Sequence, residues 1–436
     1  MGSASRIQEV FNIITRIPGK KLVVLSAMSG TTNKLVRICS HFQRAETDEA
    51  NALLDELYSA YLNTASELYN ELNFSSKAIE KLNISFELMR SILSGRYNQI
   101  NERTILAQGE IMTSELFLLY CQENALAATG INALDYMRID ENREPDYYKT
   151  SELIDNYNHL WETYQVIITQ GYICKNEKGE ITNLERGGSD YTATILGACL
   201  KAEEIQIWTD INGVHNNDPR VVDDTYPIKK MSYREAAELA YFGAKILHPS
   251  CVVPAEREGV QIRLKCTLEP EAEGTLISES SSERPITAIA AKDNITAINI
   301  NSHRMLNAYG FLRKVFEVFE RYQTPVDMIT TSEVAVSVTI DDASKLHYIR
   351  REIEQFAEFT ASPDHSIICV VGNDLYDNPQ LIGKIMTLID DIPVRMVSLG
   401  GSKYNISLLV KSDFKNKALI NLNALFVHHG QRVLSY

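Results

Sequence analysis

The chain has 436 residues and a net charge of −14, which argues against nucleic-acid binding as its main task because phosphate backbones attract basic surfaces. This length suggests two or three domains, each large enough to bury a core. The seven cysteines are scattered, with no CxxC pair, which excludes a disulfide framework and a zinc site. No apolar run approaches the roughly 18 residues of a membrane span, and no signal segment is evident. The sequence therefore predicts a soluble, cytoplasmic protein with neither membrane nor nucleic acid as partner.

The first third of the chain is predicted to be mostly helical. A helix is expected to begin near Arg6, with Ser3 or Ser5 as its N-cap. A short apolar strand follows at 21–26, and a turn through Gly30 leads to a second helix. Residues 45–125 are rich in Leu, Glu, Lys and Tyr at helical spacing, so we expect long helices there.

Short apolar strands then alternate with helices, at 166–169, 204–208 and 260–264. This alternation indicates a parallel sheet that helices cover on both faces. Composition changes at 278–285, a polar and turn-rich segment that indicates a linker. A solvated loop inside one domain is the alternative.

Beyond this segment the sequence contains two similar blocks of predicted elements. The first block has a strand at 295–300, a helix at 312–322 and strands at 326–329 and 334–340; the second has a strand at 367–371, a helix at 381–389 and strands at 394–399 and 406–410. Strand, helix, strand, strand, used twice, is typical of small ferredoxin-like βαββαβ modules. A repeated small module after an α/β domain suggests ligand sensing as much as catalysis.

A glycine pair precedes one predicted helix, in the run Arg186-Gly187-Gly188-Ser189-Asp190-Tyr191. Glycines let the backbone approach a ligand closely, and a helix start directs free N–H groups at an anion. Arg186 adds a planar fork that suits a carboxylate or a phosphate, and Asp190 is able to hold a metal or another cation. The alternative is an ordinary turn that Ser189 or Asp190 caps.

This run belongs to a series of short motifs that follow one another in a fixed order over nearly the whole chain. The others are Ser26-Ala27 with Gly30 and Thr32-Asn33, Gln108-Gly109-Glu110, residues 207–215 with Asp218-Pro219-Arg220, and Phe242-Gly243-Ala244-Lys245 with Leu247-His248-Pro249. Together they resemble aspartate kinase of the amino-acid kinase family. The second part resembles the tandem ACT regulatory region of that family, and no homoserine dehydrogenase extension follows, as in the monofunctional type.

The resemblance implies an α/β fold: an amino-acid kinase domain, with a three-layer αβα arrangement around a mainly parallel sheet, and two C-terminal ferredoxin-like ACT modules. We expect the catalytic domain at 1–277, with its first strand missing, and the regulatory region at 286–436. The first module is expected at about 302–362, and the second at about 286–301 plus 363–436. ACT modules pair edge to edge in this family, so a homodimer is the expected assembly.

The activity that the resemblance implies is ATP-dependent, Mg²⁺-requiring phosphorylation of L-aspartate to 4-phospho-L-aspartate, the first step of lysine, threonine and methionine biosynthesis. The implied catalytic residues are Asp190 and Arg186. The implied substrate-binding residues are Ser26, Thr32, Glu110, Arg186 and Ser189, with Arg186 on the α-carboxylate and Glu110 on the ammonium group. Their alternatives are helix capping for Ser26 and Thr32, and a solvated helix surface for Glu110.

The implied ATP-binding residues are Thr209, Asp210, His215, Arg220 and Lys245. His215 stands where relatives often have an aromatic residue, and it would stack on the nucleotide or be a plain loop residue. No residue is assigned as a metal ligand.

A lysine effector is implied by residues of the first module: Met305, Phe311, Leu312, Asp327, Thr331, Ser332, Glu333 and Val334. Asp327 and Glu333 would accept the amines of L-lysine. Ala308 replaces a serine of some lysine-sensitive relatives. The alternatives are threonine or no effector, with Phe311 and Leu312 as core residues.

The family's usual Lys-Phe-Gly-Gly-Thr-Ser loop, which would precede Met1, is absent from the sequence. We expect an internal methionine to have been taken as the start, with a true loss as the alternative. Because this loop places charge at the phosphoryl group, the chain as it stands is expected to be a poor kinase, by about 10²- to 10³-fold. The alternative function is a catalytically impaired, kinase-like amino-acid sensor; a kinase for another amino-acid acceptor is less well supported.

Overall fold

The computed structural model describes residues 1–427, except 186, 244–246, 281–283 and 303–308. The chain divides into two compact units. The first unit comprises Met1–Ile211 and Ser250–Ala272, and the second comprises Asn212–Pro249 and Glu273–Tyr436. Residues 212–249 thus belong to the same compact unit as the C-terminal region.

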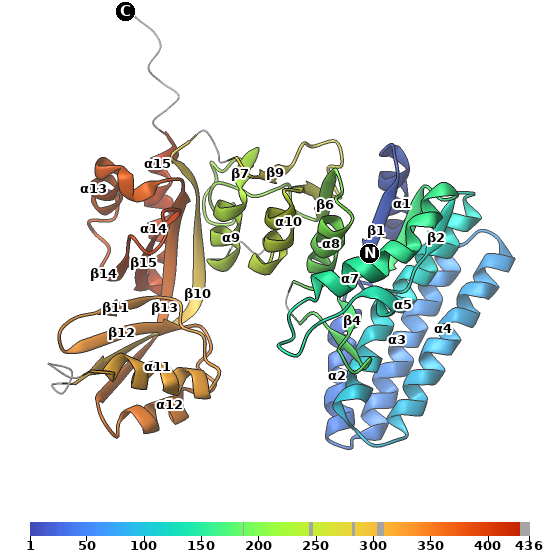
Figure 1. Ribbon diagram of the computed structural model, residues 1–436, viewed down its shortest axis with the longest axis horizontal. Coiled ribbons are helices and arrows are strands. Elements are labelled where there is room, and N and C mark those ends of the chain that lie inside the picture. Colours follow the sequence, from blue (N-terminus) through green and yellow to red (C-terminus); the bar gives the residue numbers. More distant parts are fainter. Residues whose placement is uncertain (186, 244–246, 281–283, 303–308, 428–436) are drawn as a thin grey trace, which may run out of the picture. The chain divides into compact units, whose positions relative to one another are not determined.

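The first unit is an α/β structure, coloured blue to green in Figure 1 with its second segment, 250–272, in yellow-green. Its elements are α1 (Ala4–Arg16), β1 (Lys21–Leu25), α2 (Thr31–Gln43), α3 (Thr47–Leu68), α4 (Leu72–Leu93), α5 (Gln99–Glu123), β2 (Ala128–Gly130), α6 (Ala133–Tyr136), α7 (Tyr147–Ile154), the 3₁₀ helix η1 (Asp155–Glu162), β3 (Val166–Gln170), β4 (Ile173–Lys175), β5 (Ile181–Asn183), α8 (Gly188–Cys199), β6 (Glu204–Thr209), α10 (Val252–Glu258) and β8 (Gln261–Cys266).

The predicted parallel pairing is confirmed, but the predicted strands lie in two sheets: β3 belongs to one, and β6 and β8 belong to another. The strand order is β1–β3–β2, and Lys21 and Ala128 both lie opposite Val166. Strand β6 pairs in parallel with β8. Every residue of β3 is buried, as expected for a strand covered on both faces.

The long helices predicted within 45–125 are α3, α4 and α5, which lie side by side with α2 (Figure 1). Apolar side chains at helical spacing form their common core, among them Leu54, Leu82, Phe86 and Phe117. The predicted cap of α1 is also confirmed, because the Ser3 hydroxyl accepts a hydrogen bond from the Arg6 backbone N–H at 3.3 Å.

The second unit, coloured green to red in Figure 1, contains an antiparallel sheet with helices. Its elements are β7 (Lys230–Ser232), α9 (Tyr233–Tyr241), β9 (Thr275–Ser278), β10 (Ile286–Asn301), α11 (Phe311–Arg321), β11 (Ile329–Thr331), β12 (Ala335–Ile340), α12 (Leu346–Ile353), β13 (Glu358–Gly372), the 3₁₀ helix η4 (Leu375–Asp377), α13 (Pro379–Leu388), β14 (Val394–Ser398), β15 (Asn405–Lys411), the 3₁₀ helix η5 (Ser412–Phe414), α14 (Lys415–Leu422) and α15 (Ala424–Val427).

Six antiparallel strands run in the order β11–β12–β10–β13–β15–β14, which joins the two predicted modules in one sheet. Strands β10 and β13 have 16 and 15 residues, and they pair along most of their length. Two separate apolar clusters result, one beneath α11 and α12 and the other beneath α13 and α14. Each cluster is the core of one module.

Several strand boundaries were predicted wrongly. The strands expected at 295–300 and 367–371 are the longer strands β10 and β13, which begin at Ile286 and Glu358. The strand expected at 326–329 begins at Ile329, although Asp327 N–H already donates to the Thr339 carbonyl at 2.9 Å. The Thr339 hydroxyl accepts from Met328 N–H at 2.9 Å, and this side-chain bond interrupts the regular backbone ladder. Among the described helices of both units, none is long and apolar enough to cross a bilayer.

Candidate active site and effector region

The start of helix α8 has the geometry of an anion-binding turn. Gly187 and Gly188 have φ angles of 75° and 49°, which glycine adopts without the clash of a Cβ. Gly187 is the N-cap, so Ser189 and Asp190 lie inside the first turn and the capping alternative is wrong. Helix geometry leaves the first N–H groups of α8 without an intrahelical acceptor. Arg186, the other predicted residue of this run, lies outside the described residues.

Asp190 lies in this first turn with its carboxylate partly buried. Burial raises the pKa of Asp190 to about 6. A carboxylate that has lost solvent gains from a positively charged partner or ligand. The Asp190 carboxylate is therefore suited to a position beside a metal ion or a transferring phosphoryl group.

Glu110 is buried inside α5, with 3% of its surface exposed, so the solvated-surface alternative is wrong. Its Oε1 accepts a hydrogen bond from Ala27 N–H at 3.3 Å, just after β1. Its Oε2 is buried and has no hydrogen-bond partner in the described part of the chain. Desolvation raises the pKa of Glu110 to about 7. The arrangement lacks one donor, and an ammonium group would supply it.

The turn between β1 and α2 carries the two predicted hydroxyls. Ser26 is exposed directly after β1, and Thr32 is partly exposed in the first turn of α2. Gly30 is the N-cap of α2, with a φ angle of 80°, so neither hydroxyl caps this helix. The turn is fixed to α5, because Met28 N–H donates to the Thr113 hydroxyl at 3.0 Å. Ser26 and Thr32 thus belong to a turn and helix start that hydrogen bonds connect to α5, the helix that carries Glu110.

The predicted nucleotide residues of the first unit lie at the carboxyl end of β6. The Thr209 hydroxyl donates to Asp210 Oδ1 at 3.1 Å, and Asp210 is exposed. Carboxyl ends of parallel strands are where ligands bind in open α/β sheets. The end of β6 is held in place by Thr267 N–H, which donates a hydrogen bond to the Thr209 carbonyl at 2.8 Å.

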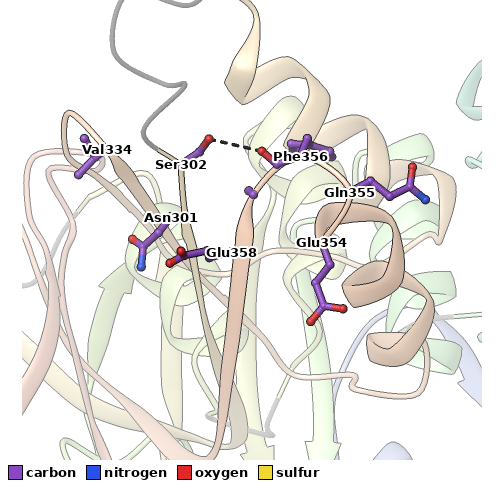
Figure 2. Close-up of a pocket in the computed structure, with 8 residues that line it drawn as sticks. Asn301, Ser302, Val334, Glu354, Gln355, Phe356 and Glu358 are labelled. Atoms are coloured by element: carbon purple, nitrogen blue, oxygen red, sulfur yellow. Dashed lines mark hydrogen bonds between the residues drawn. The ribbon is translucent and has the colours of Figure 1, made fainter.

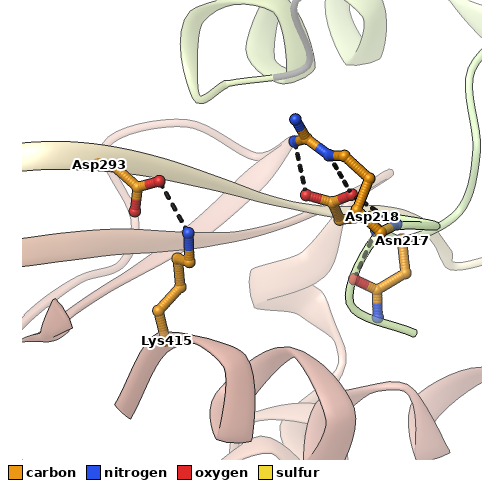
Figure 3. Close-up of polar contacts among 5 residues, drawn as sticks. Asn217, Asp218, Asp293 and Lys415 are labelled. Carbon is orange, nitrogen blue, oxygen red and sulfur yellow. Dashed lines mark hydrogen bonds and ion pairs between the residues drawn. The ribbon is translucent and has the colours of Figure 1, made fainter. Parts of the chain in front are cut away.

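The second unit contains the predicted nucleotide residues His215 and Arg220. His215 Nδ1 lies 3.0 Å from the Thr225 hydroxyl, and burial lowers the pKa of this imidazole. The Arg220 guanidinium is exposed and binds Asp218 through two bonds of 2.9 and 2.8 Å (Figure 3). These bonds hold the pKa of Asp218 below its usual range. Lys245 lies outside the described residues.

The predicted effector residues of the first module occupy three places. Phe311 is buried at the start of α11 and belongs to the module core, whereas Leu312 is 40% exposed, so its assignment to the core is wrong. Thr331, Ser332, Glu333 and Val334 form the end of β11 and the turn before β12, where the first three are exposed. Met305 and Ala308 lie outside the described residues.

Asp327 is the charged member of this set with a buried side chain, which is 1% exposed. Its Oδ1 accepts from Lys292 Nζ at 2.6 Å and from the Tyr241 hydroxyl at 2.9 Å. Sequence reasoning missed both partners, which are 35 and 86 positions away and carry no local signal. Their contact with Asp327 depends on the packing of β10 and α9.

A cavity of about 630 Å³ lies beside the end of β10, the start of β13 and the segment that follows α12 (Figure 2). It is lined by Asn301, Ser302, Val334, Glu354, Gln355, Phe356, Ala357 and Glu358. The Ser302 hydroxyl donates to the Phe356 carbonyl at 3.4 Å across its wall. Of the predicted effector residues that the structure describes, only Val334 lines this cavity.

Comparison with known proteins places these features in a family. Residues 1–266 match the model of the amino acid kinase family, and residues 368–426 match an ACT domain. The chain is 34% identical to aspartokinase 2 of Arabidopsis thaliana, over 97% of this chain and 82% of that protein. It is 30% identical to lysine-sensitive aspartokinase 3 of Escherichia coli, over 93% of this chain and 92% of that protein.

Two solved structures of E. coli aspartokinase III are similar along nearly the whole chain. The complex with aspartate and ADP, in the R-state, has a TM-score of 0.85 and 28% identity, and covers 98% of this chain and 99% of that chain. The complex with lysine and aspartate, in the T-state, has a TM-score of 0.80 and 28% identity, and covers 96% and 95%. The predicted resemblance is thereby confirmed: the chain belongs to the aspartate kinases of the amino acid kinase family and has a C-terminal ACT regulatory region.

Proposed function

We propose that this chain transfers the terminal phosphoryl group of ATP to the side-chain carboxylate of L-aspartate, forming 4-phospho-L-aspartate. The buried Glu110 carboxylate carries the proposal, because its Oε2 has no donor among the described residues and an amino-acid ammonium group supplies one. The E. coli relative has been solved with aspartate and ADP, which supports the same ligands here. These relatives favour a kinase over the alternative of an impaired amino-acid sensor.

In this proposal, residues of the first unit bind the amino-acid substrate. Glu110 accepts the ammonium group, and Arg186 binds the α-carboxylate through its planar fork. Ser26, Thr32 and Ser189 direct hydroxyls at the substrate. The N–H groups at the start of α8 face negative charge, since a helix N-terminus carries a partial positive charge.

ATP is proposed to contact Thr209, Asp210, His215, Arg220 and Lys245. Among the described residues, no group of three or more His, Cys, Asp or Glu side chains is arranged to hold a metal ion. Mg²⁺ in kinases is commonly held by one or two carboxylates together with the phosphates, and the desolvated Asp190 carboxylate fits that role. When bound, Mg²⁺ would neutralise charge on the phosphate oxygens.

An assay of ADP release with aspartate, glutamate or no acceptor tests this function. Wild-type protein should release ADP only with aspartate. Glu110→Gln should raise the aspartate KM by roughly 10- to 100-fold, the value of a hydrogen bond to a charged group. Glu115→Gln is the matched control, since Glu115 lies on the same helix and pairs with Lys81 near the surface. Turnover without aspartate, or an unchanged KM in Glu110→Gln, would contradict the proposal.

We further propose that L-lysine inhibits the enzyme through the first ACT module and that the modules pair two chains into a homodimer. The lysine complex of the E. coli relative supports the effector. Asp327 is the best-placed acceptor for an effector amine, because its Oδ2 is buried without a partner in the described part of the chain. Asp327→Ala should abolish inhibition by lysine and leave aspartate-dependent turnover in place. Inhibition that survives this change would place the effector elsewhere.

A further inference from the structure

The turn between β3 and β4 has a strained backbone. Ile173 N–H donates to the Gly171 carbonyl at 2.7 Å, which closes a γ-turn around Tyr172. Tyr172 has a φ angle of 66°, a value that residues with bulky side chains rarely adopt. Such a conformation persists only where the surrounding contacts hold it, and residues of this kind gather at functional sites. The contacts around Tyr172 therefore indicate what the strain serves.

Hydrogen bonds attach this turn to two elements of the candidate aspartate site. Gly171 N–H donates to the Leu25 carbonyl at 2.8 Å, at the end of β1. The preceding residue, Gln170, donates from Nε2 to the Ser114 hydroxyl at 2.7 Å. Ser114 lies on α5, the helix that carries Glu110. The turn is thus fixed on the side of the site that holds the proposed acceptor for the ammonium group.

The same turn packs directly against the start of α8. A Cβ built on Gly171 would lie 2.4 Å from both Cβ and Oγ of Ser189, and 2.6 Å from its Cα. Since the Cα is a backbone atom, a rotation of the serine side chain does not relieve this overlap. Any side chain at position 171 would displace either the turn or the first turn of α8. The position of the turn therefore determines where the Ser189 hydroxyl lies.

One buried hydroxyl connects the strained residue to α8. Thr192 is completely buried near the start of this helix. Its Oγ1 accepts a hydrogen bond from Tyr172 N–H at 2.9 Å and donates to the Gly188 carbonyl at 3.4 Å. The hydroxyl thus satisfies the N–H group at the centre of the γ-turn and joins it to the anion-binding turn. A buried N–H group without an acceptor is costly, so this bond holds the turn in its strained form.

We propose that Thr192 is a positioning residue for L-aspartate, which holds the Tyr172 turn against α8 and so places the Ser189 hydroxyl relative to Glu110. This inference rests on the proposed function. Without the hydroxyl, the γ-turn relaxes and Gly171 no longer fixes Ser189. Small displacements of groups that orient a substrate weaken its productive binding strongly. The nucleotide contacts proposed at the end of β6 do not involve this turn.

Thr192→Val tests the proposal, because it removes the hydroxyl and keeps the branched shape. Thr194→Val is the matched control, since Thr194 is also completely buried in α8 and donates to the Tyr191 carbonyl of its own helix at 3.0 Å. In assays of ADP release by the full chain, Thr192→Val should raise the aspartate KM by roughly tenfold relative to the control. The KM for ATP should stay within about twofold of wild type. Thr192→Ser, which keeps the hydroxyl, should restore most of the aspartate affinity.

Each other outcome has a defined meaning. An aspartate KM of Thr192→Val within about twofold of the control would overturn the positioning role. Equal increases in the KM for aspartate and for ATP would also overturn it, because a general loosening of α8 would explain them. So would a Thr192→Ser variant as impaired as Thr192→Val.

A second variant keeps the test valid if Thr192→Val does not fold. Gly171→Ala disturbs the same contact from the side of the turn and should also raise the aspartate KM without changing the KM for ATP. An unchanged aspartate KM in Gly171→Ala would overturn the proposal. Wild-type protein without aspartate-dependent turnover would instead refute the proposed function, and this inference with it.

Discussion

Replacement of Glu110 by Gln is expected to stabilise the protein while it weakens aspartate binding. Burial raises the pKa of Glu110 from 4.5 to about 7. Between these two values the folded protein keeps a proton that the unfolded chain has released. The free energy of unfolding therefore falls as pH rises, by about 1.4 kcal/mol per pH unit and by about 3 kcal/mol in total. Above pH 7 the folded wild type bears the whole cost of the buried charge.

The Gln variant avoids this cost, because it has no charge and keeps an oxygen for the Ala27 N–H group. It should exceed wild type in the free energy of unfolding by about 1 kcal/mol at pH 5.5 and by about 3 kcal/mol at pH 8. Urea unfolding at both pH values measures the difference, with Glu115→Gln as the control. Equal stability of the Gln variant and wild type at pH 8 would refute the reasoning, since Glu110 would then have an undetected partner.

Three further substitutions test the other parts of the site. Burial raises the pKa of Asp190 to about 6, and Asp190→Asn removes the charge of this carboxylate while keeping its shape. The kcat should therefore fall by about 10²- to 10³-fold. A fall of less than tenfold would show that Asp190 does not belong to the reacting centre. Gly187→Ala places a residue with a Cβ at a φ angle of 75°, so the free energy of unfolding from thermal melts should fall by about 1–2 kcal/mol. Gly383→Ala is the control, because Gly383 lies within α13 with no atom near the added Cβ, and this change should not destabilise the protein. Arg220→Gln breaks an exposed ion pair with Asp218, so the free energy of unfolding should change by less than about 1 kcal/mol. The KM for ATP should rise, because the proposed guanidinium contact with the nucleotide is lost. An unchanged KM would exclude Arg220 from the ATP site.

The sequence predicted elements well where the signal is local. The helices of 45–125 follow from apolar spacing, and the strands of the two modules follow from short β-branched runs. The strand at 326–329 was misplaced because the Thr339 hydroxyl replaces a ladder bond, and no pattern within the strand encodes that contact. The union of both modules in one sheet also could not be predicted, because it depends on β10 and β13 pairing over a separation of about 70 residues.

The sequence predicted which residues belong to the candidate site, but it did not predict their burial or their hydrogen-bond partners. The sequence left open whether Glu110 is a solvated helix carboxylate, because its burial depends on α5 packing against the turn after β1. It likewise named Asp327 without Lys292 or Tyr241. Such partners meet only in the folded chain, and they determine the charge state on which the proposed chemistry depends.

Glu110 and Asp327 both have a buried carboxylate that hydrogen bonds hold through one oxygen. In each, the other oxygen is unpartnered within the described residues. A neutral N–H group holds Glu110, whereas the Lys292 ammonium group holds Asp327. Near pH 7, Glu110 is therefore about half protonated, and an aspartate ammonium must displace that proton. Aspartate binding should release about half a proton at pH 7 and more at pH 6, which calorimetry in buffers of different ionisation enthalpy measures. Glu110→Gln should release none through this group, and proton release equal to that of wild type would show that the displaced proton comes from another residue.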